Sequence, residues 1–175
     1  MIWESSYWKE PLLKAADWMR QVRFRENTRE ATFVRIEKEI FIGFYSIRKL
    51  LDTVKVSDST KKAPYELLWY QNVKPVDALN WHHLDEVYDL ERERRETRDI
   101  RFICNLFVHS FVFVVSGDDR FEGVYVASDK LRNKKVYFIP LSHIQAIFRL
   151  VGRDYPANIS YMRNLETGEL EDNAW

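Results

Sequence analysis

Residues 98–116 read R-D-I-R-F-I-C-N-L-F-V-H-S-F-V-F-V-V-S, and the spacing of apolar side chains changes within this stretch. Up to His109 the apolar side chains recur every three or four residues, which is typical of a helix with one buried face. From Phe111 onward the apolar run is β-branched and aromatic, which is typical of a strand. The predicted apolar face of the helix consists of Ile100, Ile103, Cys104 and Phe107. The stretch therefore predicts a helix that passes directly into a strand.

The segments on either side extend this prediction to the whole chain. Residues 121–127 and 135–140 are two more strand-like runs, F-E-G-V-Y-V-A and K-V-Y-F-I-P, and the short polar turns between the runs favour an antiparallel meander. Residues 141–151 have helical spacing, as do 8–22 and 33–51 nearer the start. Gly43 interrupts the 33–51 pattern at a cost of about 1 kcal/mol relative to Ala. We take this glycine to mark a close helix–helix approach.

The segment between the second helix and residue 98 gives weaker signals. Residues 55–74 predict an ordered loop anchored by aromatic side chains, because Tyr65, Trp69 and Tyr70 would not be held in water. Residues 80–90 predict a short helix. The run E-R-E-R-R-E-T-R-D at 91–99 alternates in sign and predicts an exposed, self-neutralising segment.

Together these elements predict an α+β fold, with a helical N-terminal two-thirds followed by a three-stranded antiparallel β-meander and a C-terminal helix. We expect a single domain over residues 1–175. Its helical part covers about 5–109, the sheet plus helix about 110–155, and a polar C-terminal tail 164–175.

Composition narrows the class of protein. The 175 residues carry 27 Lys plus Arg and 27 Asp plus Glu, so the chain lacks the overall positive field of many nucleic-acid binders. A single cysteine excludes an internal disulfide and cysteine-based zinc fingers. The first residues do not have the pattern of a signal peptide, and no run approaches 18 apolar residues. We therefore expect a soluble, cytoplasmic protein with no membrane association and no cofactor.

The polar side of the predicted helix at 98–109 is the candidate site. Arg98, Arg101, Asn105 and His109 fall within about 60° of one another on a helical projection. One interpretation is structural, with the amide and imidazole capping carbonyl groups at the helix end. The other is chemical, with arginines that hold phosphate and a histidine that moves a proton, as in metal-independent RNA cleavage. We favour the structural interpretation, and the spacing is compatible with both.

The same residues carry a family resemblance. Asn105 and His109 form an N-x-x-x-H pattern at the end of an amphipathic helix, which resembles the R-N-x-x-x-H signature of HEPN domains. The resemblance covers about residues 5–110 and implies a helical, often dimeric module, with ribonucleases of toxin and antiviral systems among its members. In that family the arginine before the asparagine joins the histidine in the active site. This chain has Cys104 there, and a thiol cannot replace a guanidinium on a phosphate, so Arg101 would have to compensate.

A metal site is a weaker alternative. His82, His83, Asp85 and Glu86 lie close together in sequence, but adjacent side chains on a helix point about 100° apart and a full set of ligands is not provided. We interpret this cluster as a solvated surface and assign no metal.

We therefore expect a binding or assembly module that acts through protein–protein contacts, with a homodimer formed by its long aliphatic helices. The alternative is a HEPN-like metal-independent ribonuclease or RNA-binding protein of a bacterial defence or toxin system. In that case His109, Arg101 and Asn105 would be the catalytic residues, and Arg98 and Arg101 would bind the RNA phosphates. The sequence leaves open whether the protein is an enzyme.

Overall fold

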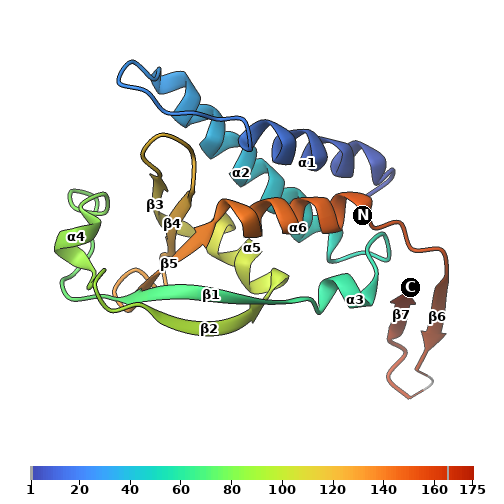
Figure 1. Cartoon of the computed structure of the whole chain (residues 1–175). Helices are drawn as coiled ribbons and strands as arrows, with labels where there is room; N and C mark the ends of the chain where they lie inside the picture. Colours follow the sequence, from blue (N-terminus) through green and yellow to red (C-terminus); the bar gives the residue numbers. More distant parts are fainter. Residues whose placement is uncertain (1, 165) are drawn as a thin grey trace.

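The computed structural model describes residues 2–164 and 166–175 and shows an α+β fold (Figure 1). A five-stranded antiparallel sheet has the order β2-β1-β5-β4-β3, and β6 and β7 form a separate two-stranded sheet. The strands are β1 (Pro64–Gln71), β2 (Arg94–Asp99), β3 (Ser110–Ser116), β4 (Gly123–Ser128), β5 (Lys135–Pro140), β6 (Ile159–Arg163) and β7 (Leu170–Ala174). The helices are α1 (Ser6–Met19), α2 (Glu30–Leu50), α3 (Asp58–Lys61), α4 (Leu84–Val87), α5 (Ile100–Val108) and α6 (Leu141–Arg153).

Two layers of helices lie on one face of the five-stranded sheet. Helices α5 and α6 contact the strands, and α1 and α2 pack over these two helices, as Figure 1 shows. The apolar stripe of α2 lies within these layers, where Ile36, Ile40 and Phe44 are fully buried. The predicted helix at 33–51 is therefore confirmed. On its other side α2 exposes Val34 and Ile42, which are 39% and 63% exposed, and the dimer contact that we expected of the long helices stays a prediction.

Gly43 permits the close approach of α2 and α6. A Cβ atom built on Gly43 would lie 2.2 Å from Cζ of the Phe148 ring. The predicted close helix–helix approach is confirmed, and the cost of the glycine in helix propensity is offset by the packing it allows.

The helix-to-strand transition at 98–116 has the predicted order, but the helix starts at Ile100, two residues later than a polar face that includes Arg98 requires. Asp99 is the N-cap of α5, and its carboxylate accepts a hydrogen bond of 2.7 Å from the Phe102 N–H. Helix α5 ends at Val108 with His109 as its C-cap, and β3 begins at Ser110. Because the residues before Asp99 have extended backbone, Arg98 belongs to β2 and not to the helix.

The prediction of a three-stranded meander as the only sheet is wrong. Strands β3, β4 and β5 do form an antiparallel meander at the predicted positions, but β1 adds to the free side of β5. The aromatic segment that we expected to be a loop is this strand. Its sequence does not alternate between apolar and polar residues, because both faces of the strand are partly covered. Leu67 is buried in the main core, and Tyr70 is buried in a smaller core on the opposite face.

The charged run at 91–99 supplies the fifth strand. Residues of β2 pair antiparallel with β1, and β2 forms the edge of the sheet. The run is exposed as expected, but it is a strand because its backbone completes the hydrogen bonding of β1. Charged side chains on an edge strand also oppose unwanted strand pairing, which explains a strand with no apolar period.

Two further boundaries differ from expectation. The predicted helix at 80–90 shortens to α4, and the region 5–109 is not wholly helical because it contains β1 and β2. Helix α6 is not C-terminal, since β6 and β7 follow it, and β7 lies within the expected polar tail at 164–175, of which Leu165 lies outside the described residues. None of the helices described is both long and apolar enough to cross a lipid bilayer.

Candidate functional site

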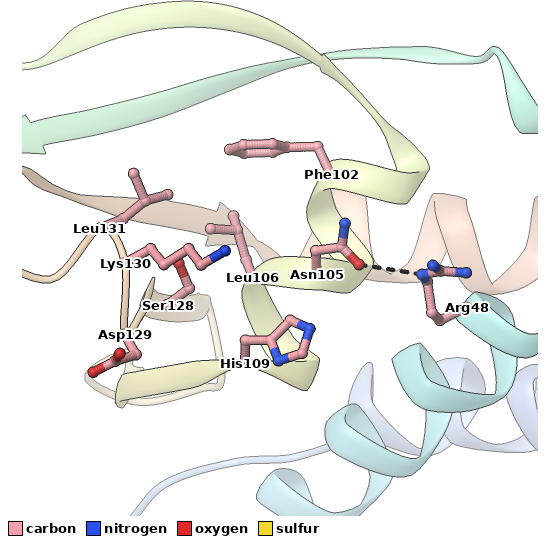
Figure 2. A pocket seen from close by; sticks show the side chains of 9 residues that line it. All are labelled: Arg48, Phe102, Asn105, Leu106, His109, Ser128, Asp129, Lys130 and Leu131. Carbon is pink, nitrogen blue, oxygen red and sulfur yellow. Dashed lines mark hydrogen bonds between the residues drawn. The ribbon is translucent and has the colours of Figure 1, made fainter.

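A cavity of about 630 Å³ lies beside the C-terminal half of α5 (Figure 2). Three parts of the chain enclose it: α5 itself, the end of α2, and the turn between β4 and β5. Its lining residues are Arg48, Phe102, Asn105, Leu106, His109, Ser128, Asp129, Lys130 and Leu131. Two of the four predicted site residues, Asn105 and His109, are thus brought to one cavity, one helical turn apart.

Arg48 joins them from α2. Its Nε donates a hydrogen bond of 3.2 Å to Oδ1 of Asn105, although the two residues are 57 positions apart in sequence. With the amide oxygen of Asn105 occupied in this way, its NH2 group remains as a donor beside the cavity. Arg48 lies within the helical pattern of residues 33–51, and nothing in that pattern singles it out as a site residue. The contact depends on the packing of α2 against α5.

Arg101 is held outside the cavity by Asp52. Its Nη1 donates to Asp52 Oδ1 at 2.8 Å, and its Nη2 donates to the Leu51 carbonyl oxygen at 3.3 Å. Arg48 also pairs with Asp52. Burial alone would raise the pKa of Asp52, but the hydrogen bonds from Arg101 and Arg48 lower it below its ordinary value. Asp52 is therefore ionised at neutral pH and partly neutralises both arginines.

Arg98 lies in a different cluster. It forms an ion pair of 3.1 Å with Glu96 on the same strand and stacks over the Phe102 ring, 4.6 Å from its centroid. Glu96 also pairs with Lys135 at 3.0 Å and accepts a hydrogen bond from the Tyr137 hydroxyl. The prediction that Arg98 shares one helical face with the other three residues is wrong, since a strand backbone carries it.

The C-terminal end of α5 is hydrogen-bonded to the turn between β4 and β5, which also lines the cavity. The Asp129 N–H donates to the His109 carbonyl oxygen at 2.9 Å. In Figure 2 the Lys130 amine points toward the middle of the cavity, while the Asp129 carboxylate points away from it. Asp129 pairs with Arg132 at 3.4 Å. Within residues 2–164 and 166–175, Lys130 has no ion-pair partner, so its charge is available to a ligand.

The remaining lining is largely apolar. Phe102, Leu106 and Leu131 form most of the apolar wall, and the Phe102 ring extends over the cavity in Figure 2. Ligand sites are commonly of this kind, with apolar walls and a few convergent polar groups, and their volumes span roughly 300–1,000 Å³. The exposed imidazole of His109 and the Lys130 amine supply the polar groups here, together with Asn105.

Cys104, which stands at the position of the HEPN arginine, does not reach this cavity. It is fully buried on the apolar face of α5, as predicted, and burial raises the pKa of its thiol. The guanidinium that bonds to Asn105 is instead that of Arg48. The residues thus offer hydrogen-bond donors and a cation to a ligand, but no thiolate.

Searches among protein-family models, curated proteins and solved structures find no match to this chain. Among the described residues, no group of three or more His, Cys, Asp or Glu side chains is arranged to hold a metal ion. His82 and His83 lie exposed before α4, with their ring centroids 4.1 Å apart.

Proposed function

We propose that the protein is a binding module that acts through protein–protein contacts, and that the cavity beside α5 receives an acidic, apolar segment of a partner protein. One observation carries this proposal. Lys130, His109 and the Asn105 amide converge on one cavity whose other walls are apolar. An acidic side chain would meet the Lys130 ammonium, and a neighbouring apolar side chain would contact Phe102 and Leu131.

The balance of charges favours a peptide over a nucleic acid. Binding along a phosphate backbone needs several free cations, each neutralising one phosphate. Arg98 and Arg101 are paired with Glu96 and Asp52, and Asp52 also pairs with Arg48. The chain as a whole has no net charge. Lys130 of the cavity, which has no ion-pair partner among the described residues, suits a single carboxylate better than a polyanion.

Binding of a labelled peptide tests the proposal. The probe is a fluorescent peptide in which glutamate alternates with leucine and phenylalanine, and the readout is fluorescence anisotropy. We expect Lys130→Glu to weaken binding at least tenfold, which corresponds to about 1.4 kcal/mol. The matched control is Lys134→Glu, an exposed lysine of the same turn that does not line the cavity, and it should leave the Kd within about twofold. Equal effects of the two variants, or no binding by the wild type, would contradict the proposal.

Metal-independent cleavage of RNA is the second candidate. It is favoured by the exposed imidazole of His109, which lines the cavity together with Lys130. A single-stranded RNA incubated with the protein in excess chelator should then be cut, and His109→Ala should abolish the cutting. The imidazole makes no hydrogen bond to the described residues, so this substitution should change the free energy of unfolding by less than about 0.5 kcal/mol. Absence of cleavage by the wild type would contradict this second candidate.

A further inference from the structure

The C-terminal hairpin of β6 and β7 is a structural unit with little support from the rest of the chain. Figure 1 shows it projecting from the body below α3, apart from the five-stranded sheet. The hairpin contacts the rest of the chain at one end. There the Ala174 N–H donates a hydrogen bond of 3.3 Å to the Asp58 carboxylate, and Ala174 is buried. A two-stranded hairpin alone is marginally stable in water, so this one lacks the packing that would hold it.

Large apolar side chains on the hairpin face solvent. Tyr161 and Met162 of β6 are 59% and 66% exposed, and Ile159 is 44% exposed. Leu170, which pairs with Arg163 across the hairpin, is 53% exposed. Exposed apolar side chains gathered in one place mark a surface for another protein.

The outer edge of β6 is free to form hydrogen bonds. Asn158 and Trp175 exchange both of their backbone hydrogen bonds, at 3.0 and 3.1 Å. Because bonded and non-bonded pairs alternate along an antiparallel ladder, the N–H and C=O groups of Ile159, Tyr161 and Arg163 point away from β7. No hydrogen bond joins these groups to any other described residue.

Charge distinguishes this edge from the outer edge of β7. Asp172 stands at the centre of β7, so pairing of β7 with a second β7 would place two aspartates opposite each other. The Ala174 N–H of that edge is already bonded to Asp58. By contrast, β6 carries no acidic residue, and Tyr161 is at its centre.

We propose that two copies of this chain join through their β6 strands, antiparallel, with Tyr161 on the two-fold axis. Ile159 of each copy then lies opposite Arg163 of the other, and the two hairpins become one four-stranded sheet. The arrangement is self-complementary, as a two-fold dimer requires. The dimer gives hydrogen-bond partners to the free N–H and C=O groups of β6 and doubles the apolar face. It therefore removes both the open edge and the small size that make an isolated hairpin unstable. The dimer does not depend on the cavity beside α5.

Proline substitution tests this arrangement, because proline lacks the N–H that the edge would donate. The mass of the full-length protein is measured by analytical ultracentrifugation over a series of concentrations. We expect the wild type to reach the dimer mass as concentration rises, and Tyr161→Pro to stay monomeric. Asp172→Pro is the matched control, since it removes the corresponding outward N–H on β7, and it should still dimerise.

A charge pair keeps the test decisive if proline unfolds the hairpin. Tyr161→Lys and Tyr161→Glu each place like charges on the two-fold axis and should each be monomeric. Mixed in equal amounts they should form a heterodimer, and high salt should weaken it. A wild type that is monomeric at all concentrations would overturn the proposal. So would a dimer that persists in both Tyr161→Lys and Tyr161→Pro, or a Lys and Glu mixture that does not associate.

Discussion

At the scale of single residues, the cavity and the cluster around Glu96 differ in how their charges are used. In the cluster, Glu96 accepts from Arg98, Lys135 and Tyr137, and its side chain is only 21% exposed. At the cavity, Lys130 is exposed and has no ion-pair partner among the described residues. Paired charges of the first kind hold the fold together, and an unpaired charge beside a cavity is available for binding.

Acid should therefore weaken the protein through Glu96. Burial alone would raise the pKa of Glu96, but hydrogen bonds from Tyr137, Arg98 and Lys135 lower it below its ordinary value. A carboxylate with a lowered pKa stabilises the fold above the unfolded-state pKa of about 4.3 and loses this effect as pH falls through the folded-state pKa. We expect Glu96→Gln to lower the free energy of unfolding by about 1–3 kcal/mol at neutral pH. The difference in the free energy of unfolding between Glu96→Gln and the wild type should disappear as the pH falls below about 4.

Urea unfolding at a series of pH values measures this difference. Glu93→Gln is the control, because Glu93 is exposed and pairs only with Arg95 among the described residues. It should cost less than about 1 kcal/mol at any pH. A gap between wild type and Glu96→Gln that stays constant down to acid pH would show that ionisation of Glu96 is not the source of its effect.

At the scale of elements, the fold depends on how closely the helices approach one another. Gly43 of α2 lies under the Phe148 ring of α6, and Phe148 is itself fully buried. The neighbouring Phe44 ring stacks on Phe107 of α5, with 4.1 Å between centroids. Movement of α2 would therefore disturb both α6 and α5, and α5 carries Asn105 and His109.

Gly43→Ala should destabilise the protein although alanine is the better helix former. The added Cβ would meet Phe148 at 2.2 Å, and overpacking of this kind costs about 1–3 kcal/mol against a gain of about 1 kcal/mol in helix propensity. Given so short a contact, we expect a net loss of about 2 kcal/mol in thermal or urea unfolding. Phe148→Leu should recover part of this loss in the double variant, because the two sites are coupled. Lys38→Ala, on the exposed side of α2, is the control, and a stable Gly43→Ala protein would contradict the packing argument.

At the scale of the whole molecule, the five-stranded sheet is packed against other parts of the chain far more extensively than the hairpin of β6 and β7. The sheet has helices on one face and a smaller apolar core on the other. The hairpin has exposed faces and one anchored end. The two sheets should therefore open independently of one another.

Hydrogen exchange should separate them. We expect the amides of β6 and β7 to exchange through local opening, much faster than those of β4, most of whose residues are buried, because local stability follows apolar burial. Protection of the hairpin should rise with protein concentration if β6 joins two copies. Hairpin amides that are as protected as those of β4 in a dilute sample would mean that the hairpin belongs to the cooperative core.

Local patterns in the sequence were sufficient for some of these elements. The helical period of residues 33–51 predicts α2, and the β-branched runs from 110 to 140 predict β3, β4 and β5, because each of these elements buries one apolar side in a regular way. The burial of Cys104 and the close approach at Gly43 follow from the same patterns. Strands β1 and β2 do not show such a pattern, since β1 has cover on both faces and β2 is a charged edge.

The sequence by itself determined the α+β class, the position of the β3–β4–β5 meander and the presence of Asn105 and His109 one turn apart at a helix end. Only the tertiary structure decided which charges surround them. Packing of α2 on α5 brings Arg48 to Asn105. Because Asp99 caps α5, Arg98 stays in β2, where it forms an ion pair with Glu96. The physical reason is that periodicity records how each element buries its own face. Strand pairing and the partners of charged side chains are set by contacts between residues that lie far apart in the sequence.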